Sequence, residues 1–195
     1  MFIYVVVVSL GVAWLRGGRL EYLGDFTLRQ MWFVFVAFGL QFLLHLPAAA
    51  GVEFIRQAAP YLYASAYYLL LTCFAINRRV PGVLFLAAGA LANLTAIMAN
   101  GGKMPVAGDL LAALGHESIR DQFASGASLT HQLLDPTTRV PWLGDVILGT
   151  PPFPNPTVFS VGDALLALGV FILVQATVVP DRALAPGSED RTSPP

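Results

Sequence analysis

The protein has 195 residues, of which 56% are hydrophobic and 12% are charged, and its formal net charge is -1. Soluble domains carry about 25% charged residues, so this composition argues against an ordinary soluble domain and indicates the membrane class. The small net charge and the lack of a basic cluster argue against a nucleic-acid partner. The single cysteine, Cys73, excludes an intramolecular disulfide.

The first apolar run covers about residues 1–15 and is followed by Arg16 and Arg19. A helix that crosses a bilayer needs about 20 mostly apolar residues, so this run is slightly short. A secretory signal peptide carries its positive charge before the apolar run, whereas here the charge follows it. We therefore expect a retained first spanning helix.

Two further apolar runs follow at about 31–49 and 59–76. Asp25 or Thr27 could cap the second run by accepting hydrogen bonds from the amides of its first turn. The third run begins with four tyrosines, a residue type that prefers the headgroup boundary of a membrane: Tyr61, Tyr63, Tyr67 and Tyr68.

The fourth run, about 81–99, is rich in small residues, and Ala88, Ala92 and Ala96 repeat at four-residue spacing. Small residues let helices approach closely in lipid, so we expect this helix to be central. The fifth run, about 159–179, begins with Ser160 and Asp163, which have the spacing of a capping box. The remaining residues, 181–195, are rich in proline, serine and charge and are predicted to be disordered.

The basic residues predict the orientation. One side of a five-helix arrangement collects most arginines: Arg16, Arg19, Arg29, Arg78, Arg79, Arg182 and Arg191. The other side holds fewer basic residues, although it has the longest loop: Arg56, Lys103, Arg120 and Arg139. The positive-inside rule places the N-terminus outside, the tail in the cytoplasm, and segment 100–158 on the outer face of a bacterial cytoplasmic membrane.

The outward segment is too long for an ordinary unstructured loop and is expected to be structured. Gly101 and Gly102 are predicted to end the fourth helix, and Asp109 could cap a short helix that ends at Gly115. A further helical turn or two is expected at 118–123. The apolar stretch 142–148 is too short to span and could lie at the interface or dip into the membrane.

These elements predict an all-α protein with a single membrane domain over residues 1–180. Its architecture is a polytopic membrane helix bundle, with five transmembrane helices and a structured outward segment between helices four and five. The expected partner common to all interpretations is the lipid bilayer.

Several motifs of the second half occur in a fixed order. They are Asn-Gly-Gly-Lys-Met-Pro-Val at 100–106, Thr130-His131, the segment 139–147 with Leu-Gly-Asp, and Phe-Ser-Val-Gly-Asp at 159–163. In this combination the sequence resembles a family of uncharacterised small bacterial multi-pass membrane proteins, the domain of unknown function 5317. The resemblance is carried by motifs in the second half and mainly by hydropathy in the first. It implies a topology and no activity.

Five polar residues form a candidate site: Asn100, Lys103, His131, Asp145 and Asp163. Asp145 and Asp163 each follow a glycine and flank one proline-rich connector, which suggests that they meet. Two nearby carboxylates could share a proton, bind a cation or pair with Lys103, and the lysine pairing is the simplest. Each residue also has a structural interpretation, as a helix cap, a headgroup-seeking lysine or a hydrogen-bonded boundary histidine.

No catalytic or metal-binding motif has diagnostic spacing. His45, His116 and His131 lack a second histidine at helical ligand spacing, so neither a metal nor a cofactor is predicted. We therefore favour a non-enzymatic membrane module that binds an envelope protein or a lipid. The alternative is a small transporter subunit or a membrane enzyme, with an outward-facing site built from segment 100–163. Convergence of the five polar residues on a water-accessible pocket would favour the alternative.

Overall fold

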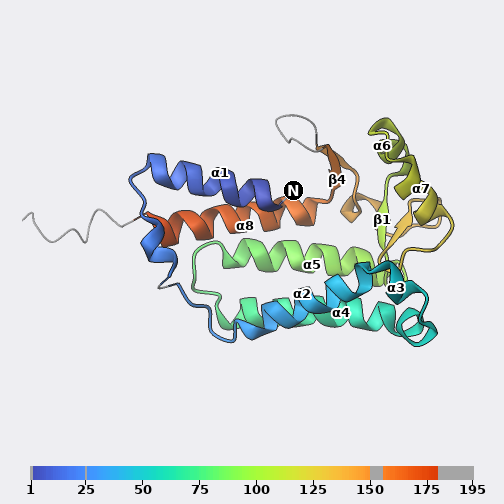
Figure 1. Cartoon of the computed structure of the whole chain (residues 1–195), viewed down its shortest axis with the longest axis horizontal. Helices are drawn as coiled ribbons and strands as arrows, with labels where there is room; N and C mark the ends of the chain where they lie inside the picture. The colour runs from blue at the N-terminus through green and yellow to red at the C-terminus, as the bar shows by residue number, and fades with distance from the viewer. Residues whose placement is uncertain (1, 25, 150–155, 180–195) are drawn as a thin grey trace, which may run out of the picture.

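The computed structural model describes residues 2–24, 26–149 and 156–179, and it is mostly helical. The predicted tail, 181–195, lies outside the described residues. The five longest helices of the described part lie roughly side by side and alternate in direction along the chain (Figure 1): α1 (Phe2–Leu15), α2 (Trp32–His45), α4 (Glu53–Ile76), α5 (Val83–Ala99) and α8 (Val161–Val178). A smaller cap, formed by residues 101–149 and 156–159, covers one end of this bundle.

Two helices of the described residues, α4 and α8, are long and apolar enough to cross a membrane. The other three long helices, α1, α2 and α5, are apolar but shorter. Each predicted span thus corresponds to an apolar helix, and two of them reach spanning length.

Two helices differ in their bounds from the predicted apolar spans, for identifiable reasons. Helix α4 begins at Glu53 rather than near 59, because Glu53 accepts hydrogen bonds from Arg56 and Gln57 across its first turn. The predicted run 31–49 is divided at Leu46, whose extended backbone is the conformation favoured before proline, and α3 (Pro47–Ala50) follows.

The fourth apolar run is central, as predicted, because α5 packs against both α4 and α8. Its packing face differs from the expected alanine repeat: Ala96 is buried, whereas Ala88 is exposed. Glycines form the contact with α8 instead. Gly89 lies against the backbone of Gly162, and Gly82 lies against the backbone of Gly169.

The cap contains strands, which corrects the all-α prediction. Strand β1 (Met104–Val106) pairs in parallel with β2 (His131–Leu133), and β3 (Ile147–Gly149) pairs antiparallel with β4 (Thr157–Phe159). The stretch 142–148 is therefore shared between a 3-10 helix and a strand. It ends the 3-10 helix η2 (Pro141–Leu143) and enters β3. A short apolar run has no periodicity that separates strand from helix, and here β4 supplies a strand partner.

Local capping signals were mostly informative. Gly101 and Gly102 have positive φ, and the Gly102 amide donates to the Ile97 carbonyl, which ends α5 as predicted. The short cap helices are α6 (Gly108–Ala113) and α7 (Glu117–Ala124). Asp109 lies in the first turn of α6 and is not its cap, since Ala107 occupies that position.

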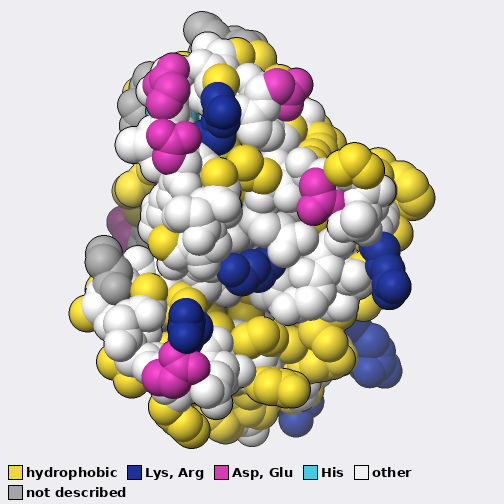
Figure 2. Space-filling view, turned by 90° about the vertical axis from the view of Figure 1, so that its right-hand side faces the viewer, with side chains coloured by type: hydrophobic (Ala, Val, Ile, Leu, Met, Phe, Trp, Pro, Cys, Tyr) yellow, Lys and Arg dark blue, Asp and Glu magenta, His cyan; other side chains and the backbone are white. Residues whose placement is uncertain are grey.

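The expected cap of α2 was also misplaced. Thr27 does not cap the helix, because α2 starts after Met31, and Asp25 lies outside the described residues. A short 3-10 helix, η1 (Leu20–Leu23), lies between α1 and α2, at the end of the bundle opposite to the cap. Charged side chains are spread over the cap end, with hydrophobic side chains around its margins (Figure 2).

Candidate functional site

Asn100, the first of the five candidate residues, has a structural role. Its Nδ2 donates to the carbonyls of Ala96 (2.7 Å) and Arg139 (2.9 Å), and its Oδ1 accepts from the Arg139 amide (2.8 Å). The side chain therefore ties the end of α5 to the segment that precedes η2. Its two donors are fully engaged in this contact.

Asn77 makes the same arrangement at the other end of the bundle and was missed in the sequence. Its Oδ1 accepts from the Arg29 amide (2.9 Å), and its Nδ2 donates to the Arg29 carbonyl (2.8 Å) and the Cys73 carbonyl (2.8 Å). Both asparagines directly follow a helix, α4 or α5. That position was the available signal, because an asparagine there can bond to a neighbouring backbone.

Replacing either asparagine by alanine is expected to loosen only the segment that it holds. Asn100→Ala should speed amide hydrogen exchange around Arg139 roughly thirtyfold, since two hydrogen bonds from its side chain to the Arg139 backbone, worth about 1 kcal/mol each, are lost. Asn77→Ala should do the same around Arg29 and leave Arg139 protected. Exchange measured by mass spectrometry checks both variants, and equal effects on the two segments would contradict the assignment.

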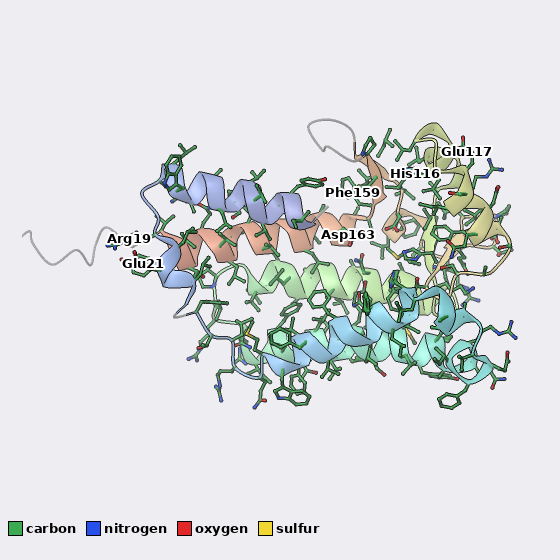
Figure 3. The ribbon with its side chains drawn as sticks, viewed as in Figure 1. Arg19, Glu21, His116, Glu117, Phe159 and Asp163 are labelled. Carbon is green, nitrogen blue, oxygen red and sulfur yellow. The ribbon has the colours of Figure 1, made fainter. Side chains whose placement is uncertain are left out.

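Asp163 forms the predicted capping box at the start of α8. The Asp163 amide donates to Ser160 Oγ (2.9 Å), and the Ser160 amide donates to Asp163 Oδ2 (3.3 Å). The second carboxyl oxygen accepts from Asn93 Nδ2 (2.9 Å), and Ser160 Oγ donates to Asn93 Oδ1 (2.8 Å). Asp163 lies at the cap end of α8, near Phe159 (Figure 3). Both of its oxygens are satisfied.

Lys103 does not pair with Asp145, so the simplest sequence hypothesis was wrong. Among the ion pairs of the described residues, none includes Lys103. The backbone explains this: the Asp145 amide donates to the Pro105 carbonyl (2.8 Å), and the Ala107 amide donates to the Asp145 carbonyl (3.0 Å). Asp145 is thus held beside the far end of β1. Partial burial lowers the pKa of Lys103.

His131 and Asp145 are the two candidates that the fold brings together. Strand β2 places His131 opposite Met104, and a bridge between Asp145 and Val106 places the carboxyl at the next part of the same strand. His131 Nε2 lies 3.9 Å from Asp145 Oδ2. Asp145 Oδ1 is buried and has no hydrogen-bond partner among the described residues.

The imidazole of His131 is held on its other sides as well. Its Nδ1 is hydrogen-bonded to Thr130 Oγ1 (2.8 Å). The ring stacks on Phe123 with centroids 5.2 Å apart, and His45 meets it edge-on at 5.9 Å. These contacts fix the ring between the cap and the end of α2.

Burial keeps this pair uncharged at neutral pH. It raises the pKa of Asp145 to about 8, and the negative charge of Asp163 adds to the effect. It lowers the pKa of His131 to about 4, with His45 as a smaller cause. The pair is therefore a neutral acid beside a neutral imidazole, which can take up or release a proton.

A pocket of about 230 Å³ opens beside His131. The ends of α2 and α3, the helix α7 and the segment before β2 line it with mostly apolar side chains: Leu44, His45, Leu46, Ala50, Ile119, Gln122, Phe123, Ala127, Ser128, Leu129, Thr130 and His131. The sequence drew attention to His45 but did not indicate that Ser128 and Phe123 line the same pocket. No local sequence pattern connects them to His45, because they belong to a segment far from it in the chain. Among the described residues, no group of three His, Cys, Asp or Glu side chains could hold a metal ion.

Comparison with known proteins identifies a family and a relative at significant similarity. A model described as a family of unknown function, DUF5317, matches residues 25–175. An uncharacterized protein of Thermotoga maritima is 31% identical over 125 residues, which are 63% of this chain and 69% of that protein. No solved structure matches.

Proposed function

The chain belongs to the DUF5317 family of unknown function, and from that premise we propose that it is a five-span protein of the bacterial cytoplasmic membrane with a binding role. Its bundle crosses the membrane, and its cap faces outward. The cap binds a ligand or partner at the membrane boundary and performs no chemistry on it.

The outer surface of the helix bundle supports the proposal that the protein lies in a membrane. This surface carries large exposed apolar side chains on every long helix: Ile3, Val7, Trp14, Phe35, Phe38, Phe42, Tyr61, Tyr68, Leu84, Leu91, Met98 and Leu168. Soluble monomers rarely expose contiguous apolar patches beyond a few hundred square ångströms. In the apolar windows of α4 and α8, fewer than half of the residues are buried. This exposure supports membrane-spanning helices over the mostly buried core helices of a soluble protein.

The shorter helices fit a bilayer with modest adjustment. Helices α1 and α2 have 14 residues each, which corresponds to roughly 21 Å against a hydrocarbon thickness of about 30 Å. Helix α2 is continued by the apolar α3, whereas α1 is followed directly by Arg16. Local thinning of the bilayer accommodates the remaining mismatch at a small energy per ångström.

The orientation follows from the two ends of the bundle. Arg19 lies at the end opposite to the cap (Figure 3), and Arg16, Arg29, Arg78 and Arg79 belong to the connections at the same end. The positive-inside rule makes this the cytoplasmic end.

Labelling of single cysteines tests this topology. In a Cys73→Ala background, Ala127→Cys in the cap should react with a membrane-impermeant maleimide in intact spheroplasts. Tyr22→Cys in η1 should react only after permeabilisation. Both positions are exposed, so accessibility within the protein does not limit either reaction. The reverse pattern, or labelling of both in intact cells, would contradict five spans.

The binding role rests on how the five polar candidates are used. Asn100 holds the backbone of Arg139, Asp163 belongs to the capping box of α8, and Lys103 takes part in none of the ion pairs of the described residues. Only His131 and Asp145 meet. The hydroxyl that is hydrogen-bonded to the imidazole, Thr130 Oγ1, belongs to a residue that is only 2% exposed. Covalent catalysis requires a nucleophile that both contacts a base and reaches the substrate, and this burial disfavours Thr130 in that role.

Transport is disfavoured by the apolar layer in the middle of α8. All residues from 164 to 174 are apolar, a length of roughly 16 Å along the helix. The next polar side chain, Gln175, donates to the Ser9 carbonyl (2.7 Å) and accepts from Arg16 (2.8 Å) near the cytoplasmic end. The Asn93–Asp163 cluster and the Gln175 cluster are therefore not joined along this helix.

A further inference from the structure

The pocket beside His131 is large enough to hold one end of a ligand but not a whole drug-sized molecule. Its volume is about 230 Å³, below the range of about 300–1,000 Å³ that encloses most of a drug-sized molecule. Leu44, Ser128, Leu129 and Thr130 are buried, whereas Leu46 and Ile119 are more than a third exposed. A bound molecule would thus place one end against buried groups and extend past an apolar rim.

An apolar stripe on α2 leads to this rim. Phe35, Phe38 and Phe42 are each more than half exposed. Their spacing of three and four residues places them on one face of the helix, and the same spacing continues to His45 and Leu46 at the pocket. In the proposed topology the stripe faces hydrocarbon, so an alkyl chain can lie along it while its polar end enters the pocket.

Two of the polar side chains that line the pocket can bind a hydroxyl group, one as a hydrogen-bond acceptor and one as a donor. His45 Nδ1 is 2.7 Å from the Gln41 carbonyl. A carbonyl only accepts, so Nδ1 carries the proton, and Nε2 of the neutral ring is left as an acceptor. Ser128 Oγ accepts from the amides of Thr130 (3.3 Å) and His131 (3.1 Å). Among the hydrogen bonds of the described residues it donates none, so its buried hydroxyl proton can go to a ligand.

The lining also indicates the charge of the ligand. None of the residues that line the pocket is Lys, Arg, Asp or Glu. Burying a charged headgroup without a counter-ion is costly, whereas a hydroxyl can donate to His45 Nε2 and accept from Ser128.

We propose that this pocket binds the uncharged, hydroxyl-bearing headgroup of a membrane lipid, whose acyl chain lies along the Phe35–Phe38–Phe42 stripe. This inference rests on the proposed topology and names the ligand class of the proposed binding role. His131 forms part of the wall of the site, with both ring nitrogens directed to Thr130 and Asp145. His45 and Ser128 make the recognition contacts.

Native mass spectrometry of the full-length protein in a nonionic detergent tests the proposal. The probe is a monoacylglycerol, and the comparison ligand is the lysophosphatidic acid of the same chain length. We expect the protein to bind the monoacylglycerol at least tenfold more tightly. Ala127→Trp fills the pocket and should weaken binding at least tenfold. Ala124→Trp is the matched control, because Ala124 is an exposed alanine of α7 that does not line the pocket.

His45→Phe keeps an aromatic ring against His131 and removes the acceptor, so it should weaken binding about three- to tenfold, the value of one neutral hydrogen bond. Equal binding by Ala127→Trp and Ala124→Trp, a preference for the anionic lipid, or no binding of the monoacylglycerol would overturn the inference. Two other results would contradict the proposed function rather than this inference. Inverted cysteine labelling would contradict the topology. Hydrolysis of the monoacylglycerol by the wild-type protein, abolished by His131→Ala, would contradict a purely binding role.

Discussion

Gly89→Leu is expected to destabilise the protein by about 3 kcal/mol or more, because α5 and α8 touch through their backbones at this position. A Cβ at residue 89 would collide with the Gly162 carbonyl oxygen and would lie 2.8 Å from both the amide nitrogen and Cγ of Leu166. Overpacking typically costs about 1–3 kcal/mol and occasionally more. Backbone atoms cannot rotate aside, so the helices have to separate.

Gly39→Leu is the matched control for this prediction. Gly39 also lies inside a long helix, α2, and a Cβ there would meet nothing within 4 Å. Leucine favours helix over glycine by roughly 0.5–1 kcal/mol, so this variant should be as stable as the wild type or more stable. Thermal unfolding of both variants in the same detergent makes the comparison. Similar unfolding temperatures would show that the glycine contact does not hold α5 against α8.

The stability of the cap is expected to fall by roughly 2 kcal/mol between pH 6.5 and pH 8, through the raised pKa of Asp145. Folded Asp145 has a pKa of about 8, whereas an unfolded aspartic acid has a pKa of about 3.9. Between these values the folded protein binds a proton that the unfolded chain has released, so stability falls as pH rises. The slope is about 1.4 kcal/mol per pH unit.

His131 acts in the opposite direction and sets the lower limit of this window. Its folded pKa is about 4, below the value of about 6.5 for an unfolded histidine. Between pH 4 and 6.5 the unfolded chain therefore binds a proton that folded His131 does not, so stability rises with pH and offsets the Asp145 effect. Only the Asp145 effect remains above pH 6.5.

Asp145→Asn isolates the two contributions. The amide does not titrate, so the fall above pH 6.5 should disappear, and a rise between pH 4 and 6.5 should emerge from His131 alone. Asp121→Asn, an exposed position on α7, should keep the wild-type profile. Hydrogen exchange of β1 and β2 as a function of pH checks all three proteins. A fall above pH 6.5 that persists in Asp145→Asn would assign it to another group.

The sequence by itself determined the features whose cause lies within a few neighbouring residues. Apolar runs marked all five long helices, because each helix carries its apolar character along its own length. Gly102 marked the end of α5 because a left-handed residue is least strained as glycine. Ser160 and Asp163 marked the start of α8, because both partners of a capping box lie within one turn. The family resemblance was identified from motifs of the same local kind and is confirmed by the match over residues 25–175.

Only the tertiary structure decided which of the polar residues meet. Asn93 bonds Asp163 across 70 residues, and Asn100 bonds the Arg139 backbone across 39. His131 and Asp145 meet because two different segments lie beside β1. The sequence could not distinguish this arrangement from the Lys103–Asp145 pair that charge alone favours. Strand register, rather than attraction between opposite charges, positions Asp145, and register depends on backbone pairing between segments far apart in the chain.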